Sequence, residues 1–216
     1  MRKHVWFFSV LMFFCTVSFA QQGSTEQLAV EFLRSGQTEK ALQLFEEAYS
    51  RNPTQHIFRL YLDALLQQRN IRQAERLVRR HQQNFPQNLI TTIDLGHVYL
   101  VSGDLSRAER EFRRVIDNLP NSQSQIAEIA VAFFNRNQVE HAIQTFLKGR
   151  QLLRNPHAFS QDLAILYERT NRIADMTKEY LTMLEHNPRS LPLVQQRIQV
   201  VLASDTEDKR ATNEIR

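Results

Sequence analysis

The sequence predicts an all-α fold, built as a tandem array of similar helix pairs. A small residue returns at intervals of 33, 34 and 34 residues, at Ala41, Ala74, Ala108 and Ala142. Prolines follow nearly the same interval, at Pro53, Pro86, Pro120, Pro156 and Pro188. The 216 residues are 42% hydrophobic and 23% charged and include only 5 glycines, a composition typical of a folded, helix-rich chain. A period near 34 indicates helix pairs that stack on one another.

Each unit of this array divides into two helices and a tight turn. In the third unit, Leu95, Gly96 and Tyr99 lie at the spacing of one helix face, and Ala108 and Phe112 lie on a face of the next helix. Between the helices we expect turns that contain Gly or Asn in a left-handed conformation. The five turns are Ser35-Gly36-Gln37, Gln68-Arg69-Asn70, Ser102-Gly103-Asp104, Arg136-Asn137-Gln138 and Thr170-Asn171-Arg172. A proline then ends the second helix.

This pattern resembles the tetratricopeptide repeat over residues 22–188, in about five units. The third unit carries the resemblance most clearly, with Leu95-Gly96, Tyr99, Gly103-Asp104, Ala108, Phe112 and Pro120, and lacks only the tryptophan often found near the start of the repeat. The second unit is the most divergent, and the fifth has Met176 in place of the small residue. The resemblance implies a right-handed solenoid of helix-turn-helix repeats. An irregular helical bundle is the alternative, and five units in phase argue against it.

Residues 1–20 have the layout of a secretory signal peptide. Arg2 and Lys3 precede an apolar run, and Ser18 and Ala20 are small residues at the expected cleavage site. The apolar run is shorter than the roughly 20 residues that an uncleaved membrane anchor needs. A lipoprotein would need a cysteine directly after the cleavage site, whereas Cys15 lies within the apolar run.

Cleavage after Ala20 would remove the only cysteine of the chain, so the mature protein would contain no disulfide and no cysteine nucleophile. The net charge of +4 would fall to +2, because Arg2 and Lys3 would be removed. Together with export, this small positive charge argues against nucleic acid as a partner.

The segment 189–216 follows the last proline and keeps a weaker pattern. Leu193, Ile198 and Leu202 fit a first helix, and Ala211 and Ile215 fit the beginning of a second. We therefore expect a partial sixth repeat that belongs to a longer array, or alternatively a C-terminal solvating helix.

The sequence offers no constellation for catalysis. The histidines beyond the signal peptide never stand at the i, i+4 spacing that presents a metal to one helix face. There is no glycine-rich phosphate loop and no nucleophile elbow. We therefore expect a protein that is not an enzyme and needs no cofactor or metal.

The remaining possibility is a surface that binds another protein, and the family resemblance implies where this surface would lie. In tetratricopeptide proteins the first helices line a concave groove that binds partners. Carried over by position, the groove residues are Val30, Leu33, Arg59, Asp63, Ile90, Ile93, His97, Val131, Phe134 and Ile165. The apolar residues at the centre predict a partner helix or apolar segment and disfavour a charged C-terminal tail. The alternative is that some of these residues pack on one another in the core.

A second feature is a series of arginines on adjacent second helices. It comprises Arg76, Arg79, Arg80, Arg107, Arg110, Arg113 and Arg114. On the convex side, these residues could bind an acidic protein or an anionic membrane surface. The alternative is a solvated face in which nearby glutamates balance the arginines.

The function that the sequence favours is an exported protein-interaction scaffold or adaptor, located in the bacterial periplasm or cell envelope. The alternative is the N-terminal recognition module of a larger envelope enzyme or secretion machine. An RNA-binding helical array has a similar period, but export disfavours it. The oligomeric state and the identity of the partner do not follow from the sequence.

Overall fold

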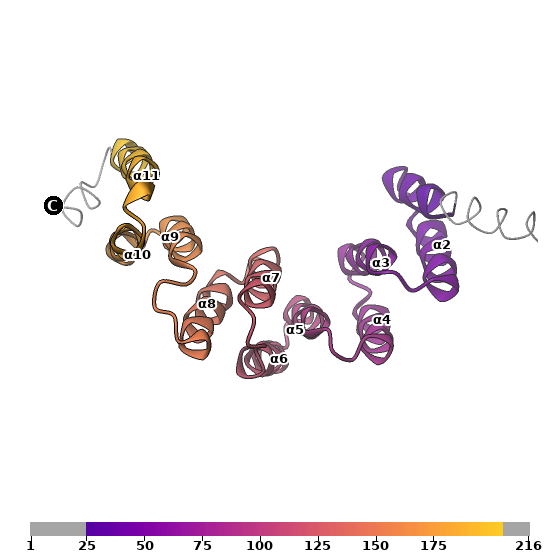
Figure 1. The fold of residues 1–216 in the computed structure, drawn as a ribbon. Helices are drawn as coiled ribbons and strands as arrows, with labels where there is room; N and C mark the ends of the chain where they lie inside the picture. The colour runs from indigo at the N-terminus through magenta and orange to yellow at the C-terminus, as the bar shows by residue number, and fades with distance from the viewer. Residues whose placement is uncertain (1–24, 205–216) are drawn as a thin grey trace, which may run out of the picture. The chain divides into compact units, whose positions relative to one another are not determined.

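The computed structural model describes residues 25–204, and within this range every regular element is a helix (Figure 1). The predicted signal peptide, residues 1–20, lies outside the described residues, as do residues 205–216 at the end of the predicted sixth repeat. The predicted fold class, an all-α array of helix-turn-helix repeats, is confirmed. Its right-handed solenoid form stays a prediction, because the described residues fall into two compact units, divided between Glu109 and Arg110.

The first unit contains two complete helical hairpins and the first helix of a third. Residues 25–34 are helical and precede α2. The following helices are α2 (Thr38–Arg51), α3 (Gln55–Gln67), α4 (Ile71–Asn84) and α5 (Leu89–Ser102). Helix α6 (Leu105–Asp117) begins in this unit and ends in the second.

The second unit continues the same alternation. Its helices are α7 (Gln123–Phe134), α8 (Val139–Leu153), α9 (Ser160–Arg169), α10 (Ile173–His186), the short 3-10 helix η1 (Pro188–Ser190) and α11 (Leu191–Ser204). Helix α11 occupies the position where the sequence predicts the first helix of a sixth repeat.

The five predicted turns share one backbone geometry. In each, one residue has a positive φ: Gly36, Arg69, Gly103, Asn137 and Asn171, with values of 77°, 52°, 86°, 59° and 54°. Two hydrogen bonds accompany it, such as Gly103 N–H to Leu100 O at 3.0 Å and Asp104 N–H to Tyr99 O at 2.9 Å. This is the Schellman arrangement, which satisfies the last carbonyl groups of the first helix. The turn therefore sets a constant entry point for each second helix.

The second turn corrects one detail of the sequence prediction. Arg69, not Asn70, takes the left-handed conformation. Asn70 is the N-cap of α4, and its side chain accepts a hydrogen bond from the backbone N–H of Gln73 at 3.4 Å. Asparagine is a favoured N-cap residue, and here Asn70 caps α4. The strained left-handed position is therefore taken by Arg69, which carries a Cβ.

The recurring small residue stands five positions after each left-handed residue. Ala41, Ala74, Ala108 and Ala142 are all buried, with at most 1% of their surface exposed. Met176 stands at the same place in the fifth hairpin and is also fully buried. The position is therefore a core position in every hairpin, whatever the size of its side chain.

The link between α8 and α9 differs from the others. Arg154 and Phe159 both have positive φ values, 51° and 62°, and Phe159 packs on Phe146 with ring centroids 4.8 Å apart. Gly149 of α8 makes this packing possible, because a Cβ there would lie 2.8 Å from Ile126 and 3.1 Å from the Phe159 ring. The longer interval between Pro120 and Pro156, 36 residues, is the sequence signal of this irregular link.

Candidate partner-binding surfaces

The predicted groove residues of the first unit lie in unequal environments. Arg59 and Asp63 on α3 are exposed. Val30, Leu33, Ile90 and His97 are half-buried. Ile93 is fully buried, so its assignment to an open groove is wrong: this side chain belongs to the core.

Polar and charged residues form the surface of α3 in this unit. His56 on α3 lies 2.8 Å from Glu26 on the helix of residues 25–34, a distance that joins Nε2 to a carboxylate oxygen. Arg59 and Asp63 follow on the same helix and are exposed. The α3 part of the predicted groove is therefore polar, whereas Val30, Leu33 and Ile90 on the other first helices of this unit are apolar and half-buried.

The first-helix surface of the second unit is more apolar. Val131 on α7 is 50% exposed. Phe134, one turn later, is half-buried, and the Arg169 guanidinium lies 4.9 Å from its ring centroid. Ile165, on the same helix as Arg169, is also half-buried. The cation–π contact joins α7 to α9 and brings part of the predicted groove together.

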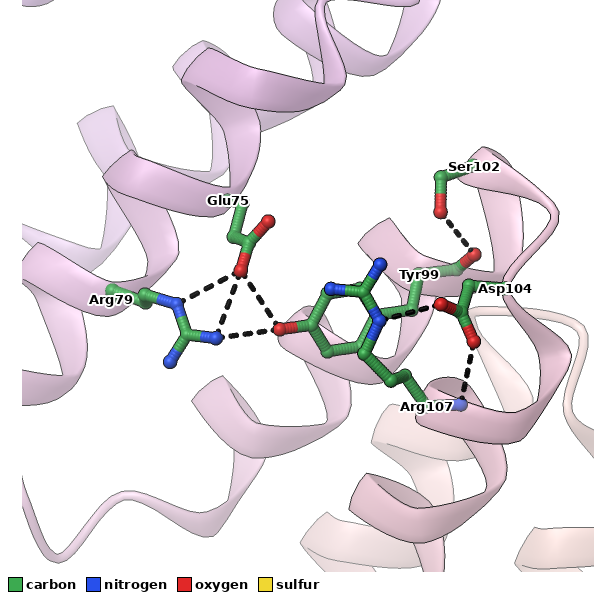
Figure 2. Close-up of polar contacts among 6 residues, drawn as sticks. All are labelled: Glu75, Arg79, Tyr99, Ser102, Asp104 and Arg107. Carbon is green, nitrogen blue, oxygen red and sulfur yellow. Dashed lines mark hydrogen bonds and ion pairs between the residues drawn. The ribbon is translucent and has the colours of Figure 1, made fainter.

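The predicted arginine series is largely occupied by contacts within the chain. In the first unit, Arg79 bonds to Glu75 at 2.9 Å and to the Tyr99 hydroxyl at 2.7 Å (Figure 2). The Tyr99 hydroxyl donates to the same carboxylate at 2.9 Å. Burial by itself would raise the pKa of Glu75, but the hydrogen bonds from Arg79 and Tyr99 outweigh it, and the pKa is lowered.

Arg107 covers the other side of the same tyrosine. Its guanidinium lies 4.5 Å from the Tyr99 ring centroid and bonds to Asp104 at 2.6 Å (Figure 2). Asp104 also accepts a hydrogen bond from the backbone N–H of Arg107 at 2.9 Å. Tyr99 thus joins α5, α4 and the start of α6 within the first unit.

Arg80 forms a comparable network between α2, α3 and α4. It bonds to Glu46 at 2.8 Å, and its guanidinium lies 4.6 Å from the Tyr49 ring centroid. The Tyr61 hydroxyl donates to the second oxygen of Glu46 at 2.9 Å. Burial would raise the pKa of Glu46, but bonds from Arg80 and Tyr61 outweigh this effect and lower it.

The remaining arginines of the series are solvent-exposed. Arg76 on α4 is exposed and forms no hydrogen bond or ion pair with the described residues. Arg110, Arg113 and Arg114 are exposed in the second unit, where Arg114 lies 3.7 Å from Glu111. The contacts of Arg79, Arg80 and Arg107 favour an internally balanced face over a free basic surface.

A cavity between α2 and α4 was not predicted from the sequence. Its volume is about 780 Å³, and its lining comprises Glu39, Leu42, Gln43, Glu46, Tyr61, Asn70, Gln73, Arg76, Leu77 and Arg80. We call it the α2–α4 cavity. One feature of the sequence is consistent with this cavity. Polar residues recur one helical turn apart on α2 and again on α4, next to Leu42 and Leu77.

Other site types find little support in the part of the chain that the structure describes. Residues 25–204 contain no group of three or more His, Cys, Asp or Glu side chains placed to hold a metal ion. Among the described helices, none combines the length and apolar character that crossing a membrane requires.

These features define an all-α helical-repeat protein with two kinds of surface, an apolar first-helix patch and a polar cavity. Residues 32–88 match the tetratricopeptide repeat family. The matched segment includes α2, α3 and α4, so the repeat predicted there is confirmed. No curated protein matches the chain.

Solved structures of low sequence identity resemble the chain. A thermophilic tetratricopeptide repeat protein of Thermus thermophilus has 19% identity and a TM-score of 0.41, covering 84% of this chain and 99% of its own. A tetratricopeptide repeat protein of Parabacteroides merdae has 13% identity and a TM-score of 0.42, covering 89% and 77%. MamA AMB-1 has 18% identity and a TM-score of 0.36, covering 77% and 91%.

Proposed function

We propose that this protein is an exported, non-catalytic scaffold that binds an apolar segment of another protein. The binding surface is the first-helix face of the second unit, around Val131, Phe134 and Ile165. Tetratricopeptide repeats, one of which lies in residues 32–88, serve as protein-interaction units. The proposal is narrower than the sequence prediction, because Ile93 is buried and α3 of the first unit has a polar surface.

The exposure of Val131 carries the proposal. A fully buried valine contributes about 1.5–3 kcal/mol relative to an exposed one, so a half-exposed valine beside an aromatic ring leaves part of this free energy available to a partner. The neighbouring Arg169 supplies a polar rim, since its guanidinium already lies on the Phe134 ring. An apolar centre with a polar edge is the usual composition of a protein-binding patch.

The test compares Val131→Asp with Leu147→Asp. Leu147 lies on the second helix α8 and is 37% exposed, so both changes place a carboxylate at an exposed aliphatic position. Tagged wild-type and variant proteins are incubated with envelope extract, and bound proteins are quantified by mass spectrometry. We expect Val131→Asp to lose the specific partners at unchanged helix content, whereas Leu147→Asp retains them.

Equal recovery by the two variants would refute binding at the α7–α9 face. Export is tested separately by mass spectrometry of the protein recovered from the periplasm. Processing after Ala20 would give Gln21 as the first residue. Absence of the protein from that fraction would contradict export, and a retained N-terminal methionine would contradict cleavage after Ala20.

A further inference from the structure

The walls of the α2–α4 cavity come from the same positions of two successive repeats. The α2 wall comprises Glu39, Leu42, Gln43 and Glu46, and the α4 wall comprises, 34 residues later in each case, Gln73, Arg76, Leu77 and Arg80. The ion pair between Glu46 and Arg80, at 2.8 Å, joins two of these equivalent positions. All lining residues belong to the first unit. The cavity is therefore bounded by equivalent faces of two neighbouring second helices.

Two polar networks fix lining side chains at the ends of the cavity. At one end, Glu46 accepts hydrogen bonds from Arg80 at 2.8 Å and from the Tyr61 hydroxyl at 2.9 Å. At the other end, the side-chain amides of Asn70 and Gln73 bond to each other, and Asn70 also accepts from the backbone N–H of Gln73 at 3.4 Å. These side chains are held in place before a ligand binds, which lowers the entropy cost of binding.

Three other lining side chains are available to a ligand. Glu39, Gln43 and Arg76 are exposed and form no hydrogen bond or ion pair with any other residue that the structure describes. The carboxylate only accepts hydrogen bonds, the guanidinium only donates them, and the amide does both. The open part of the cavity therefore offers donors and acceptors together.

The charges of the lining cancel. Two carboxylates, of Glu39 and Glu46, stand against two guanidinium groups, of Arg76 and Arg80. An anionic ligand would lie near both carboxylates, and a cationic ligand would lie near both guanidinium groups, so either would meet repulsion as well as attraction. The lining therefore favours a ligand that carries no net charge.

Apolar and polar side chains also alternate across the cavity. Leu42 on α2 stands at the position equivalent to Arg76 on α4, and Gln43 stands at the position equivalent to Leu77. A purely apolar ligand would cover the guanidinium and the amide without replacing their hydrogen bonds to water, which costs free energy. A ring with hydroxyl groups at its edge and C–H groups on its faces suits both kinds of neighbour, because a hydroxyl group donates and accepts.

We propose that the α2–α4 cavity binds a neutral carbohydrate of one or two sugar rings. Its volume of about 780 Å³ lies within the range of about 300–1,000 Å³ that is usual for small-molecule sites. Sugar hydroxyls accept from Arg76, donate to Glu39 and do both with Gln43. The C–H groups of the ring pack on Leu42 and Leu77. This site goes beyond the proposed partner binding, which uses the α7–α9 face.

NMR spectroscopy of the purified protein with a panel of neutral sugars gives the first test. The panel comprises glucose, galactose, mannose, N-acetylglucosamine, maltose, cellobiose, lactose and diacetylchitobiose, and the dipeptide Ala-Ala and citrate serve as charged comparisons. We expect saturation transfer to at least one sugar, with amide shifts confined to α2, α4 and the residues around Tyr61. If no sugar binds, if the shifts lie elsewhere, or if only the dipeptide or citrate binds, the proposal is wrong.

Substitutions of two exposed arginines on α4 test the assigned contacts. Arg76→Met removes a donor from the cavity, whereas Arg72→Met makes the same change one helical turn earlier, outside the lining. Arg76→Met should weaken sugar binding about 10- to 100-fold, the change expected for hydrogen bonds to a charged group, and Arg72→Met should bind like the wild type. Gln43→Leu, on the opposite wall, should weaken binding as well. Unchanged affinity in both cavity variants would overturn the proposal.

The substitution Val131→Asp separates this inference from the proposed function. Val131 lies on α7 in the second unit, outside the cavity, so this variant should bind sugar like the wild type while it loses partner binding. If Val131→Asp also abolishes sugar binding, the sugar binds at the α7–α9 face, and the assignment to the α2–α4 cavity is wrong. Circular dichroism of every variant verifies that the helices are intact.

Discussion

The substitution Glu179→Ala should destabilise the second unit more than any surface change. Arg150 on α8 bonds to both carboxylate oxygens of Glu179 on α10, one of them at 2.8 Å. The same guanidinium donates to the Ser160 hydroxyl at 2.9 Å and to the Ala158 carbonyl at 2.6 Å. The arginine side chain is 15% exposed and the glutamate side chain 8%. One buried ion pair therefore joins α8, α9 and α10.

The expected loss of stability follows from the unpaired charge that Glu179→Ala leaves on Arg150. Removing one partner of a buried ion pair costs about 3–5 kcal/mol, because the remaining charge stays buried without its counter-ion. The additional replacement Arg150→Met removes that orphan charge. The double variant should therefore be more stable than Glu179→Ala alone, so the two changes should not be additive.

Urea unfolding followed by circular dichroism measures these differences as shifts in the midpoint and free energy of unfolding. The matched control is Asp175→Ala, which removes the exposed Arg172–Asp175 pair on the same helix, where the side chains are 40% and 45% exposed. An exposed pair contributes about 0.2–1 kcal/mol. If Glu179→Ala costs no more than this control, the reasoning about the buried pair is refuted.

Three further predictions concern the core and the turns. Gly149→Ala should lower the free energy of unfolding by about 1–3 kcal/mol, because the added Cβ would overlap Ile126 and Phe159. A urea midpoint equal to that of the wild type would contradict this prediction. Arg69→Gly should raise the free energy of unfolding by up to about 1 kcal/mol, because glycine adopts the left-handed conformation without strain. Urea unfolding measures this change as well, and a midpoint below that of the wild type would argue against the prediction. Burial lowers the pKa of His81 to about 4 from 6.5, so the unfolded state binds the proton first as the pH falls. Stability should therefore drop by up to about 3 kcal/mol between pH 6.5 and 4, and His81→Gln should show a smaller drop than the wild type in urea titrations across this window.

The environment of His81 explains why this histidine belongs to the fold rather than to a metal site. It is 1% exposed and stacks on Phe58 with ring centroids 3.9 Å apart. The Tyr49 hydroxyl donates to Nδ1 at 2.9 Å, and Nε2–H donates to the Gln55 side-chain oxygen at 3.0 Å. Both ring nitrogens are thus used by the neutral form, and a proton on Nδ1 would displace the tyrosine bond.

The repeat itself could be predicted because its determinants are local. The left-handed turn residue and the buried small residue five positions later, such as Gly103 and Ala108, depend on a few neighbouring side chains. Each hairpin repeats this pair of residue types at the same spacing, so five weak local patterns together give one strong prediction. Arg69 shows the limit of this local reasoning. The pattern predicts Gly or Asn at the left-handed position, but Arg69 takes it because Asn70 caps α4.

The surfaces could be predicted only in part, since they depend on how adjacent hairpins pack. Ile93 and Ala127 stand 34 residues apart, at equivalent first-helix positions, yet Ile93 is fully buried and Ala127 is partly exposed. The pair Arg150–Glu179 joins residues 29 positions apart, for which the 34-residue period gives no signal. The α2–α4 cavity likewise arises from the distance between two second helices, which a periodic pattern does not encode.

Two tyrosines show that a position can keep its physical role while its residues exchange. Tyr99 and Tyr167 stand two repeats apart, and each is covered by a guanidinium 4.5 Å from its ring centroid. Over Tyr99 the arginine follows its acidic partner by three residues, in the order Asp104, Arg107. Over Tyr167 the order is reversed, because Arg172 precedes Asp175.

Position by position, the acid of one repeat corresponds to the base of the other. The shared requirement is a cation on the tyrosine ring held by a carboxylate three residues away, and either order of the pair meets it. A comparison of residue types alone would score this pair as two mismatches. The contact geometry shows instead that both repeats hold the turn against the last tyrosine of the first helix by the same interaction.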